Sequence, residues 1–192
     1  MRRILGRGFY SRPTVRVAKE LLGKYLVVNK NGRTVSGKIV EVEAYRGPYD
    51  PASHAYRGMT PRNKIMFGEA GHAYVYFTYG MYYCLNVITE RKGSPAGVLI
   101  RALEPTDGIA LMKRRRKKDD VRELTSGPGK LCQAMGIDKS LYGADLTGKT
   151  IYVEDRGEKE GRIVSAHRIG IDEGKEKKWR FYLEDSRFVS KK

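Results

Sequence analysis

Three residue types are scarce in this chain of 192 residues: it contains two cysteines, three histidines and one tryptophan. Cys84 and Cys132 cannot form a disulfide framework, and their apolar neighbours predict reduced, buried thiols. His54, His72 and His167 occur without CxxC or HExxH spacing, so we expect no zinc site. No GxGxxG or GxxxxGK[ST] loop occurs either, and we therefore expect no cofactor.

Long hydrophobic runs are also missing. No stretch reaches about 18 consecutive apolar residues, which excludes a transmembrane helix. The first seven residues carry charges without an apolar segment, so we expect no signal peptide. Together with the reduced thiols, these absences predict a cytoplasmic protein. Apolar residues are spread along the chain and no linker divides it, which predicts one folded domain over residues 1–192.

Acidic residues are too few to balance the basic ones. The chain has 22 Asp and Glu against 38 Lys and Arg, a net charge of +16. Such an excess attracts polyanions, among which nucleic acid is the commonest partner. The alternative is a generally basic, highly charged surface. The run Lys113–Lys118 favours a nucleic-acid partner, but many such runs are solvated helix ends, so its role stays open.

Strand patterns outnumber helical ones and do not alternate regularly with them. Helical spacing occurs over Thr14–Tyr25, Asp107 is expected to cap a second helix, and a third is expected from Pro128 to Gly136. Strands are expected at 25–28, 37–45, 73–79, 82–88, 97–101, 151–154, 162–171 and 180–183. The pattern predicts an α+β fold with a curved, mixed or mainly antiparallel sheet and flanking helices.

Two carboxylates share one face of the strand expected at 37–45. Because side chains alternate along a strand, Glu41, Glu43 and Tyr45 point to one side, while Val40 and Ala44 point to the other. A carboxylate at the edge of a basic groove is suited to general-base catalysis. The alternative is a solvent-facing strand whose acids pair with nearby Lys and Arg.

The segment 74–87 has the pattern of a β-hairpin that turns at Gly80-Met81. Its five tyrosines within ten residues exceed what a core needs, because each buried hydroxyl requires a partner. Bases stack well on aromatic rings, and an aromatic tip can wedge between base pairs. Tyr76 and Tyr79 fall on opposite faces of the expected hairpin, which leaves two different roles open for them.

Two further segments place a charged residue where it would need a partner. Ser126–Lys130 is suited to seat a phosphate at a helix N-terminus, although an ordinary capped turn explains it equally well. Arg101 follows a buried-strand pattern, and a buried guanidinium requires a carboxylate or a ligand as its partner. His54, taken alone, is typical of a hydrogen-bonded structural histidine.

Several ordered motifs resemble the alkyladenine (3-methyladenine, methylpurine) DNA glycosylase family of mammalian type. The motifs lie at 41–48, 60–63, 74–86, 99–105 and 126–134, with weaker similarity at 167–171 and 180–182. The resemblance covers most of the chain. It implies one α+β domain whose protruding β-hairpin inserts into the DNA minor groove while a damaged purine is flipped into a pocket.

The resemblance also implies catalytic roles for named residues. Glu43 is expected to be the general base that activates water, and Arg101 with a backbone carbonyl near Ile169 is expected to hold that water. The base pocket is expected to be lined by Tyr45, His54 and Tyr76, with Asn86 guarding its edge against the wrong exocyclic group.

Further residues are implied to contact DNA. Tyr79 is expected to fill the gap left by the flipped nucleotide, with Met81 beside it, and Thr60, Arg62 and Lys130 are expected to contact phosphates. The implied partner is double-stranded DNA that contains damaged purines. The protein is expected to bind it as a monomer and to have no membrane partner. The implied enzyme is monofunctional, and leaves an abasic site without cutting the strand. A non-catalytic nucleic-acid binding module, and a family member acting on RNA or another lesion, remain alternatives.

Overall fold

A computed structural model describes residues 2–159 and 161–191. The regular structure of these residues consists mainly of four α-helices and nine strands. The helices are α1 (Arg7–Tyr10), α2 (Thr14–Leu21), α3 (Ile109–Arg116) and α4 (Pro128–Met135). The strands are β1 (Arg3–Ile4), β2 (Tyr25–Lys30), β3 (Arg33–Arg46), β4 (Ala73–Thr78), β5 (Tyr82–Ile88), β6 (Ala96–Asp107), β7 (Ile151–Asp155), β8 (Ile163–Ala166) and β9 (Arg180–Leu183).

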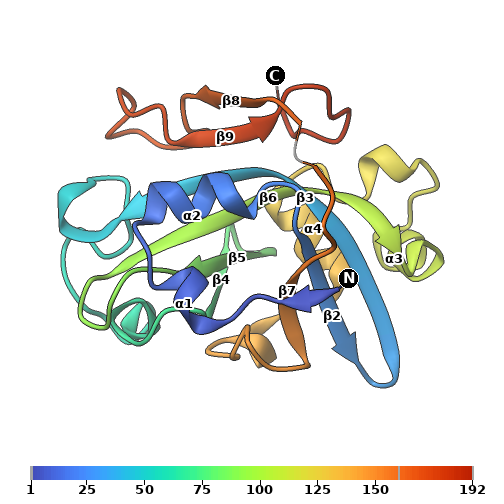
Figure 1. Cartoon of the computed structure of the whole chain (residues 1–192), viewed down its shortest axis with the longest axis horizontal. Coiled ribbons are helices and arrows are strands. Elements are labelled where there is room, and N and C mark those ends of the chain that lie inside the picture. Colours follow the sequence, from blue (N-terminus) through green and yellow to red (C-terminus); the bar gives the residue numbers. More distant parts are fainter. Residues whose placement is uncertain (1, 160, 192) are drawn as a thin grey trace.

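All nine strands belong to one sheet. Its main path runs β1-β7-β2-β3-β6-β5-β4, and β9 pairs with both β3 and β8. Every pairing within the described residues is antiparallel. The expected α+β fold with a mainly antiparallel sheet is therefore confirmed. Figure 1 shows β3 and β6 sweeping in a curve across the molecule, with the β8–β9 pair above them.

The long strand β3 organises the sheet. It pairs with β2 over its first six residues, with β9 over residues 41–43 and with β6 along most of its length. Its register against β6 shifts around residues 39–42, which marks a bulge. Ile39 and Val40 consequently both join the main hydrophobic core, although they are consecutive. A bulge bends a strand and re-aims the following side chains, here Glu41 and Glu43.

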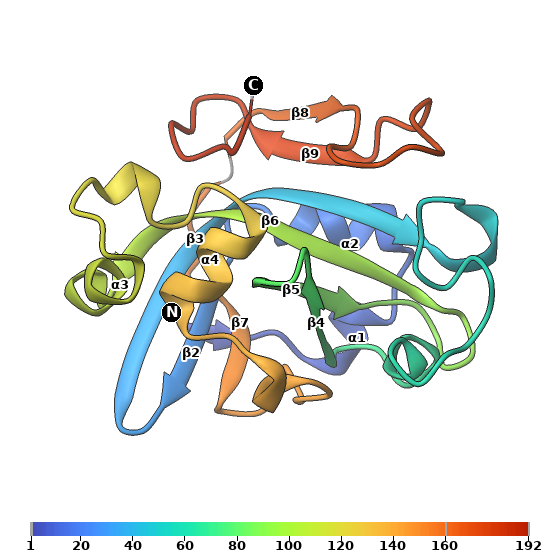
Figure 2. The same ribbon diagram turned by 180° about the vertical axis from the view of Figure 1, so that it is seen from behind.

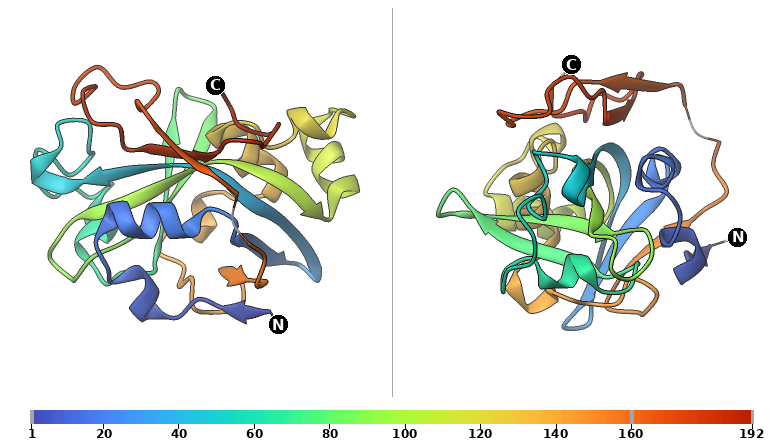
Figure 3. Two further views of the ribbon diagram at one scale, coloured as in Figure 1. Left: turned by 45° about the horizontal axis from the view of Figure 1, so that its top comes forward. Right: turned by 90° about the vertical axis from the view of Figure 1, so that its left-hand side faces the viewer.

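Helices cover both faces of the sheet. Helix α2 packs on β3 and β6, whereas α4 packs on β5 and β6 and carries α3 against it. Figure 2, seen from behind, shows α4 and the β4–β5 hairpin in front of the sheet, on the side away from α2. The β4–β5 hairpin protrudes from this side, opposite the N-terminal helices, in the right-hand view of Figure 3.

Several expected element ends are wrong. The strand expected at 97–101 continues to Asp107 as β6, and the helix expected over Thr14–Tyr25 ends at Leu21 as α2. Gly108, with a φ of 74°, caps α3 in place of Asp107, because Asp107 is the last residue of β6 and accepts hydrogen bonds from Ser36 and Arg156. The strand expected at 162–171 ends at Ala166 as β8. Beyond it the chain turns inward, and the side chain of Arg168 is fully buried.

Candidate active site

A cavity of about 320 Å³ lies at the base of the β4–β5 hairpin. This volume is at the small end of the range for ligand pockets, which suits one flat ring system. Seven of the residues expected at the site line it: Tyr45, His54, Tyr76, Tyr79, Asn86, Arg101 and Ile169. Tyr74, Cys84, Met66, Leu99 and Ala52 also contribute to its wall, and the sequence analysis gave them no such role.

Glu43 lies behind the cavity wall and not on it. Its side chain has no exposed surface, yet three residues that line the cavity bind it. Glu43 Oε1 accepts a hydrogen bond of 2.8 Å from the backbone N–H of Ile169. Glu43 Oε2 accepts bonds from the Tyr45 hydroxyl at 2.8 Å and from Arg101 Nη1 at 3.3 Å. A carboxylate offers about four acceptor sites, so one site remains, on Oε1.

Ile169 contacts Glu43 directly, because its backbone N–H donates to the carboxylate. The expected role of a backbone carbonyl near Ile169 in holding the water stays a prediction. This contact joins the loop after β8 to β3, 126 residues apart in the sequence. It anchors the part of the cavity wall formed by residues 169–171 to the carboxylate.

The environment of Glu43 favours proton uptake. Burial raises the pKa of Glu43, and the charge of Glu41 adds to this increase. Arg101, the Ile169 amide and the Tyr45 hydroxyl act in the opposite direction without cancelling it. A carboxyl group whose pKa is raised toward neutrality is a better general base at physiological pH than an ordinary glutamate.

Glu41 is buried beside Glu43, so the solvent-facing interpretation of this strand is wrong. Arg180 Nη1 donates to Glu41 Oε1 at 2.8 Å, and the Ser190 N–H donates to Oε2 at 2.6 Å. Arg101 Nε lies 3.4 Å from Glu41 Oε1, so Arg101 is shared between the two glutamates. Two buried carboxylates and two arginines thus form one connected network, in which each charge has a counter-charge.

An aromatic wall forms the other side of the cavity. The His54 ring lies edge-on to Tyr76 with 4.6 Å between ring centres, and His54 Nδ1 is 3.0 Å from the Tyr74 hydroxyl. Partial burial of the ring and the charge of Arg62 lower the pKa of His54, so it is neutral at pH 7. Burial raises the pKa of Tyr74 to about 12, and Tyr74 therefore stays a phenol.

A second buried ion pair supports the Tyr45 side of the cavity. Arg168 and Asp50 are both fully buried and joined by two hydrogen bonds, and Arg168 also donates to the Ala44 carbonyl. The Arg168 guanidinium lies over the Tyr45 ring, 4.7 Å from its centre. This pair was not predicted from the sequence. The sequence pointed to this region only through the weak family similarity at 167–171. Hydrophobic periodicity predicts local structure and gives no information on contacts between residues 118 positions apart.

The hairpin tip is the most exposed aromatic surface. Strand pairing ends at Thr78 and Tyr82, which leaves a three-residue loop, and Tyr79 in this loop is 81% exposed. Tyr79 and Gly80 have φ values of 51° and 67°, in the left-handed region. Met81 is also mostly exposed. The loop therefore presents Tyr79 and Met81 outward, as expected for residues that would meet a partner.

The three residues expected at phosphates differ in their contacts. Lys130 is exposed at the first turn of α4. Arg62 donates to the Phe77 carbonyl at 2.9 Å and lies 5.2 Å from the Tyr76 ring centre, so it already braces the hairpin. The Thr60 backbone and hydroxyl are engaged with Asn63. Among them, only Lys130 has a side chain without an intramolecular hydrogen bond or ion pair within the described residues.

Two features are missing from the described parts of the chain. Within residues 2–159 and 161–191, no cluster of three His, Cys, Asp or Glu side chains is placed to hold a metal ion. Over the same residues, no helix has the length and apolar character needed to cross a membrane. Cys84 and Cys132 are free and buried, as expected.

Comparisons with known proteins identify the family of the chain. The sequence model of the methylpurine-DNA glycosylase (MPG) family matches residues 8–187. A relative from Carboxydothermus hydrogenoformans is 54% identical over 191 residues, covering 98% of this chain and all of the relative. Relatives from Desulfitobacterium hafniense and Methanocella arvoryzae are 50% and 51% identical, covering 98% of this chain and 98% and 96% of their own lengths. All three carry the provisional name 3-methyladenine DNA glycosylase.

Proposed function

The chain belongs to the methylpurine-DNA glycosylase family and is a DNA glycosylase, and we propose that it flips damaged purines out of duplex DNA and hydrolyses their N-glycosidic bond with water activated by Glu43. The proposed substrates are alkylated and deaminated purines: 3-methyladenine, 7-methylguanine, hypoxanthine and ethenoadenine. We expect the product to be an abasic site.

One observation carries this proposal. A buried carboxylate, Glu43, is held by three donors that all line a single cavity of base-sized volume. Its one remaining acceptor site lies on Oε1, next to the Ile169 amide in the cavity wall. A water donating to this site would be oriented at the edge of the cavity, where the sugar of a flipped nucleotide would lie.

The proposed reaction is a displacement at C1′ of the sugar. The water oxygen bonds to C1′, its proton passes to Glu43, and the electron pair of the C1′–N bond leaves with the purine. The nucleotides of 3-methyladenine and 7-methylguanine are already cationic, so each of these purines departs as a neutral base. Hypoxanthine and ethenoadenine start uncharged, so each must also take up a proton to leave as a neutral base. A carboxylate fixed near the sugar also stabilises the positive charge that develops there in the transition state.

Flipping would depend on the hairpin and on the aromatic wall. A base inside a duplex is out of reach, and extruding it costs a few kcal/mol. Tyr79 at the tip would fill the vacated position, while stacking against pocket tyrosines would stabilise the flipped base. No lysine occurs among the described residues that line the cavity, which supports a hydrolytic enzyme without strand-cutting activity.

The proposal is tested by base release from duplexes that each carry one lesion, under single-turnover conditions. The native protein is compared with Glu43→Gln and with Glu20→Gln, a control that removes a half-buried carboxylate on α2, paired with Arg12 and Arg16. We expect release by the native protein and Glu20→Gln, and loss of release with retained duplex binding for Glu43→Gln. Strand breaks should require subsequent alkali.

Two outcomes would contradict this proposal. Binding of damaged duplex without release of any base by the native protein would favour a non-catalytic binding module. Release by Glu43→Gln at the native rate would remove Glu43 from the reaction and leave it a structural ion-pair partner of Arg101.

A further inference from the structure

The basic run at the end of α3 is divided into two sets of side chains. Arg115 donates to the Ala134 carbonyl at 3.0 Å, and Arg116 donates to the Gln133 side chain, so both arginines fasten α3 to α4. Lys118 pairs with Glu123 at 3.4 Å. Half of the run therefore has a structural explanation that requires no ligand.

Of the other three residues of the run, Lys113 is half-buried, whereas Arg114 and Lys117 are exposed. Neither the Arg114 side chain nor the Lys117 side chain has a hydrogen bond or an acidic partner within the described residues. Neighbouring acidic residues do not neutralise the charges of Arg114 and Lys117, because residues 109–123 contain seven Lys and Arg and only three Asp and Glu. Partial burial and the charges of Arg33 and Arg114 lower the pKa of Arg115, which is consistent with an excess of positive charge here.

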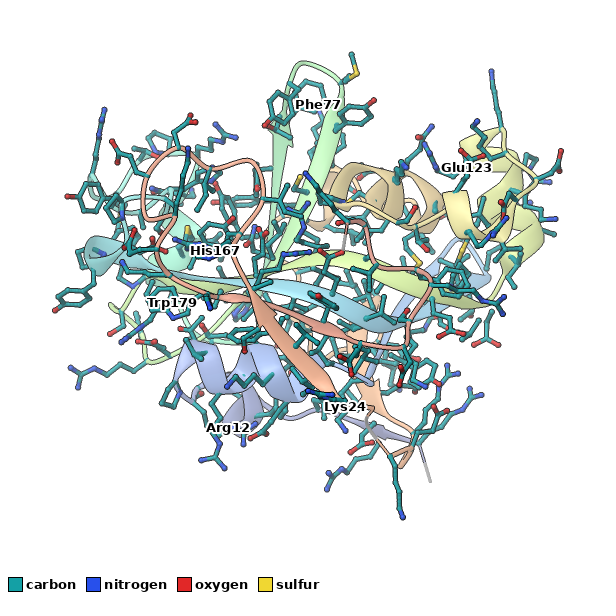
Figure 4. The ribbon with its side chains drawn as sticks, turned by 90° about the horizontal axis from the view of Figure 1, so that it is seen from above. Arg12, Lys24, Phe77, Glu123, His167 and Trp179 are labelled. Carbon is teal, nitrogen blue, oxygen red and sulfur yellow. The ribbon has the colours of Figure 1, made fainter. Side chains whose placement is uncertain are left out.

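A chain of contacts places these two residues relative to the hairpin. Gly129 on α4 packs so closely on Tyr82 of the hairpin that an added Cβ would lie 2.9 Å from the Tyr82 ring. One turn further along α4, Gln133 binds the backbone and side chains at the end of α3. Figure 4 shows Phe77 of the hairpin and Glu123 of the α3–α4 connection projecting toward the same side, with Arg12 on the opposite side.

We propose that Arg114 and Lys117 form a second phosphate-binding site, the α3 site, which holds the DNA backbone one helix width away from the inserted hairpin. The inference rests on the proposed function, because it needs the hairpin to be in the duplex. Helix α4 separates the two elements, and a helix with its side chains is about 10–12 Å across. Phosphates of one strand are about 3.4 Å apart along the axis, so the α3 site falls about three to four nucleotides from the lesion.

Salt dependence of binding measures the α3 site directly. Each lost phosphate contact reduces the slope of log K against log salt by about 0.9, so Arg114→Gln/Lys117→Gln should lower it by about 1.8. The matched control is Arg3→Gln/Arg16→Gln, which removes the same charge from β1 and α2, away from the hairpin in Figure 3. The control should keep the native slope. An unchanged slope for the first variant, or an equal decrease for the control, would overturn the inference.

Nested duplexes locate the α3 site along the DNA. Duplexes with one hypoxanthine are shortened from either end, and binding is measured for native protein and Arg114→Gln/Lys117→Gln. We expect native affinity to fall when one flank becomes shorter than about four base pairs, and the variant to be insensitive to that flank. Equal sensitivity of both proteins, or a difference seen with duplex RNA and not with DNA, would refute the α3 site.

Base release by the native protein from the same duplexes separates the two proposals. Release together with an unchanged slope for the variant would reject only the α3 site. Absence of release from every lesion would reject the proposed function itself. Thermal unfolding of both double variants verifies that each protein is folded, which the exposure of all four side chains leads us to expect.

Discussion

The Tyr45 hydroxyl donates a hydrogen bond of 2.8 Å to Glu43, but only Tyr45 lines the cavity. Burial, followed by the charge of Glu43, raises the pKa of Tyr45 far above its usual value, so the phenol keeps its proton and remains a donor. Tyr45 thus belongs to the pocket through its ring and to the carboxylate network through its hydroxyl. A substitution that separates the two functions tests the connection.

Tyr45→Phe keeps the ring and removes this donor. A hydrogen bond to a charged group contributes about 1.5–3 kcal/mol, so we expect single-turnover base release to fall by about 10- to 100-fold. The lost bond had lowered the pKa of Glu43, so the acidic limb of the pH–rate profile should move to higher pH. A native rate and profile would show that the hydroxyl has no part in catalysis.

Glu41→Gln should move the acidic limb of the pH–rate profile to lower pH. The charge of Glu41 raises the pKa of Glu43, so its removal leaves Glu43 ionised to lower pH. Arg180 would lose a buried counter-charge, which destabilises proteins by about 3–5 kcal/mol. Urea unfolding measures the loss of stability. Glu41 would be a purely structural residue if stability fell while the pH–rate profile kept its native midpoint.

Asp50→Asn should reduce the pH dependence of stability in acid. Burial alone would raise the pKa of Asp50, but hydrogen bonds and charge from Arg168, the Arg46 amide and Lys177 outweigh it and lower that pKa. The carboxylate therefore stabilises the fold above about pH 4 and loses this effect as pH falls through its lower folded value. At pH 7 the free energy of unfolding of the variant should be about 3–5 kcal/mol lower than that of the native protein. Below pH 4 its free energy of unfolding should change less with pH than that of the native protein. Parallel unfolding curves for variant and native protein against pH would contradict this assignment.

Tyr79→Ala should weaken flipping while the pocket stays intact. Stacking of an aromatic side chain on a base is worth about 1–3 kcal/mol, so we expect roughly 5- to 100-fold weaker formation of the flipped complex. Fluorescence of 2-aminopurine next to the lesion reports this step. Tyr49→Ala is the control, because Tyr49 is 76% exposed and lies outside the hairpin. Equal effects of both substitutions would remove the wedge role of Tyr79.

Much of the local structure follows from sequence patterns. Alternation on the strand expected at 37–45 placed Glu41, Glu43 and Tyr45 together, and the structure confirms that they belong to one network. The turn of the hairpin also follows from local residues. These features depend on the two-residue period of strands and on turn chemistry, which act over a few positions.

The partners of these residues could not be predicted in the same way. Whether Glu41 and Glu43 face solvent or protein depends on β6, β9 and the loop after β8, which pack against β3 from distant parts of the chain. Asp107 has a good capping residue type, but Ser36 and Arg156 compete for its carboxylate. Contacts between remote segments override local preference, and a single sequence does not display them.

The hydrogen bond from the Ser190 amide to Glu41 spans 149 residues. A contact between positions so far apart in the sequence costs loop-closure entropy before it forms. A chain that ended before residue 190 would keep all nine strands, the last of which ends at Leu183, but Glu41 Oε2 would lose this donor. Glu41 would then be held through Oε1 alone, by Arg180 and Arg101.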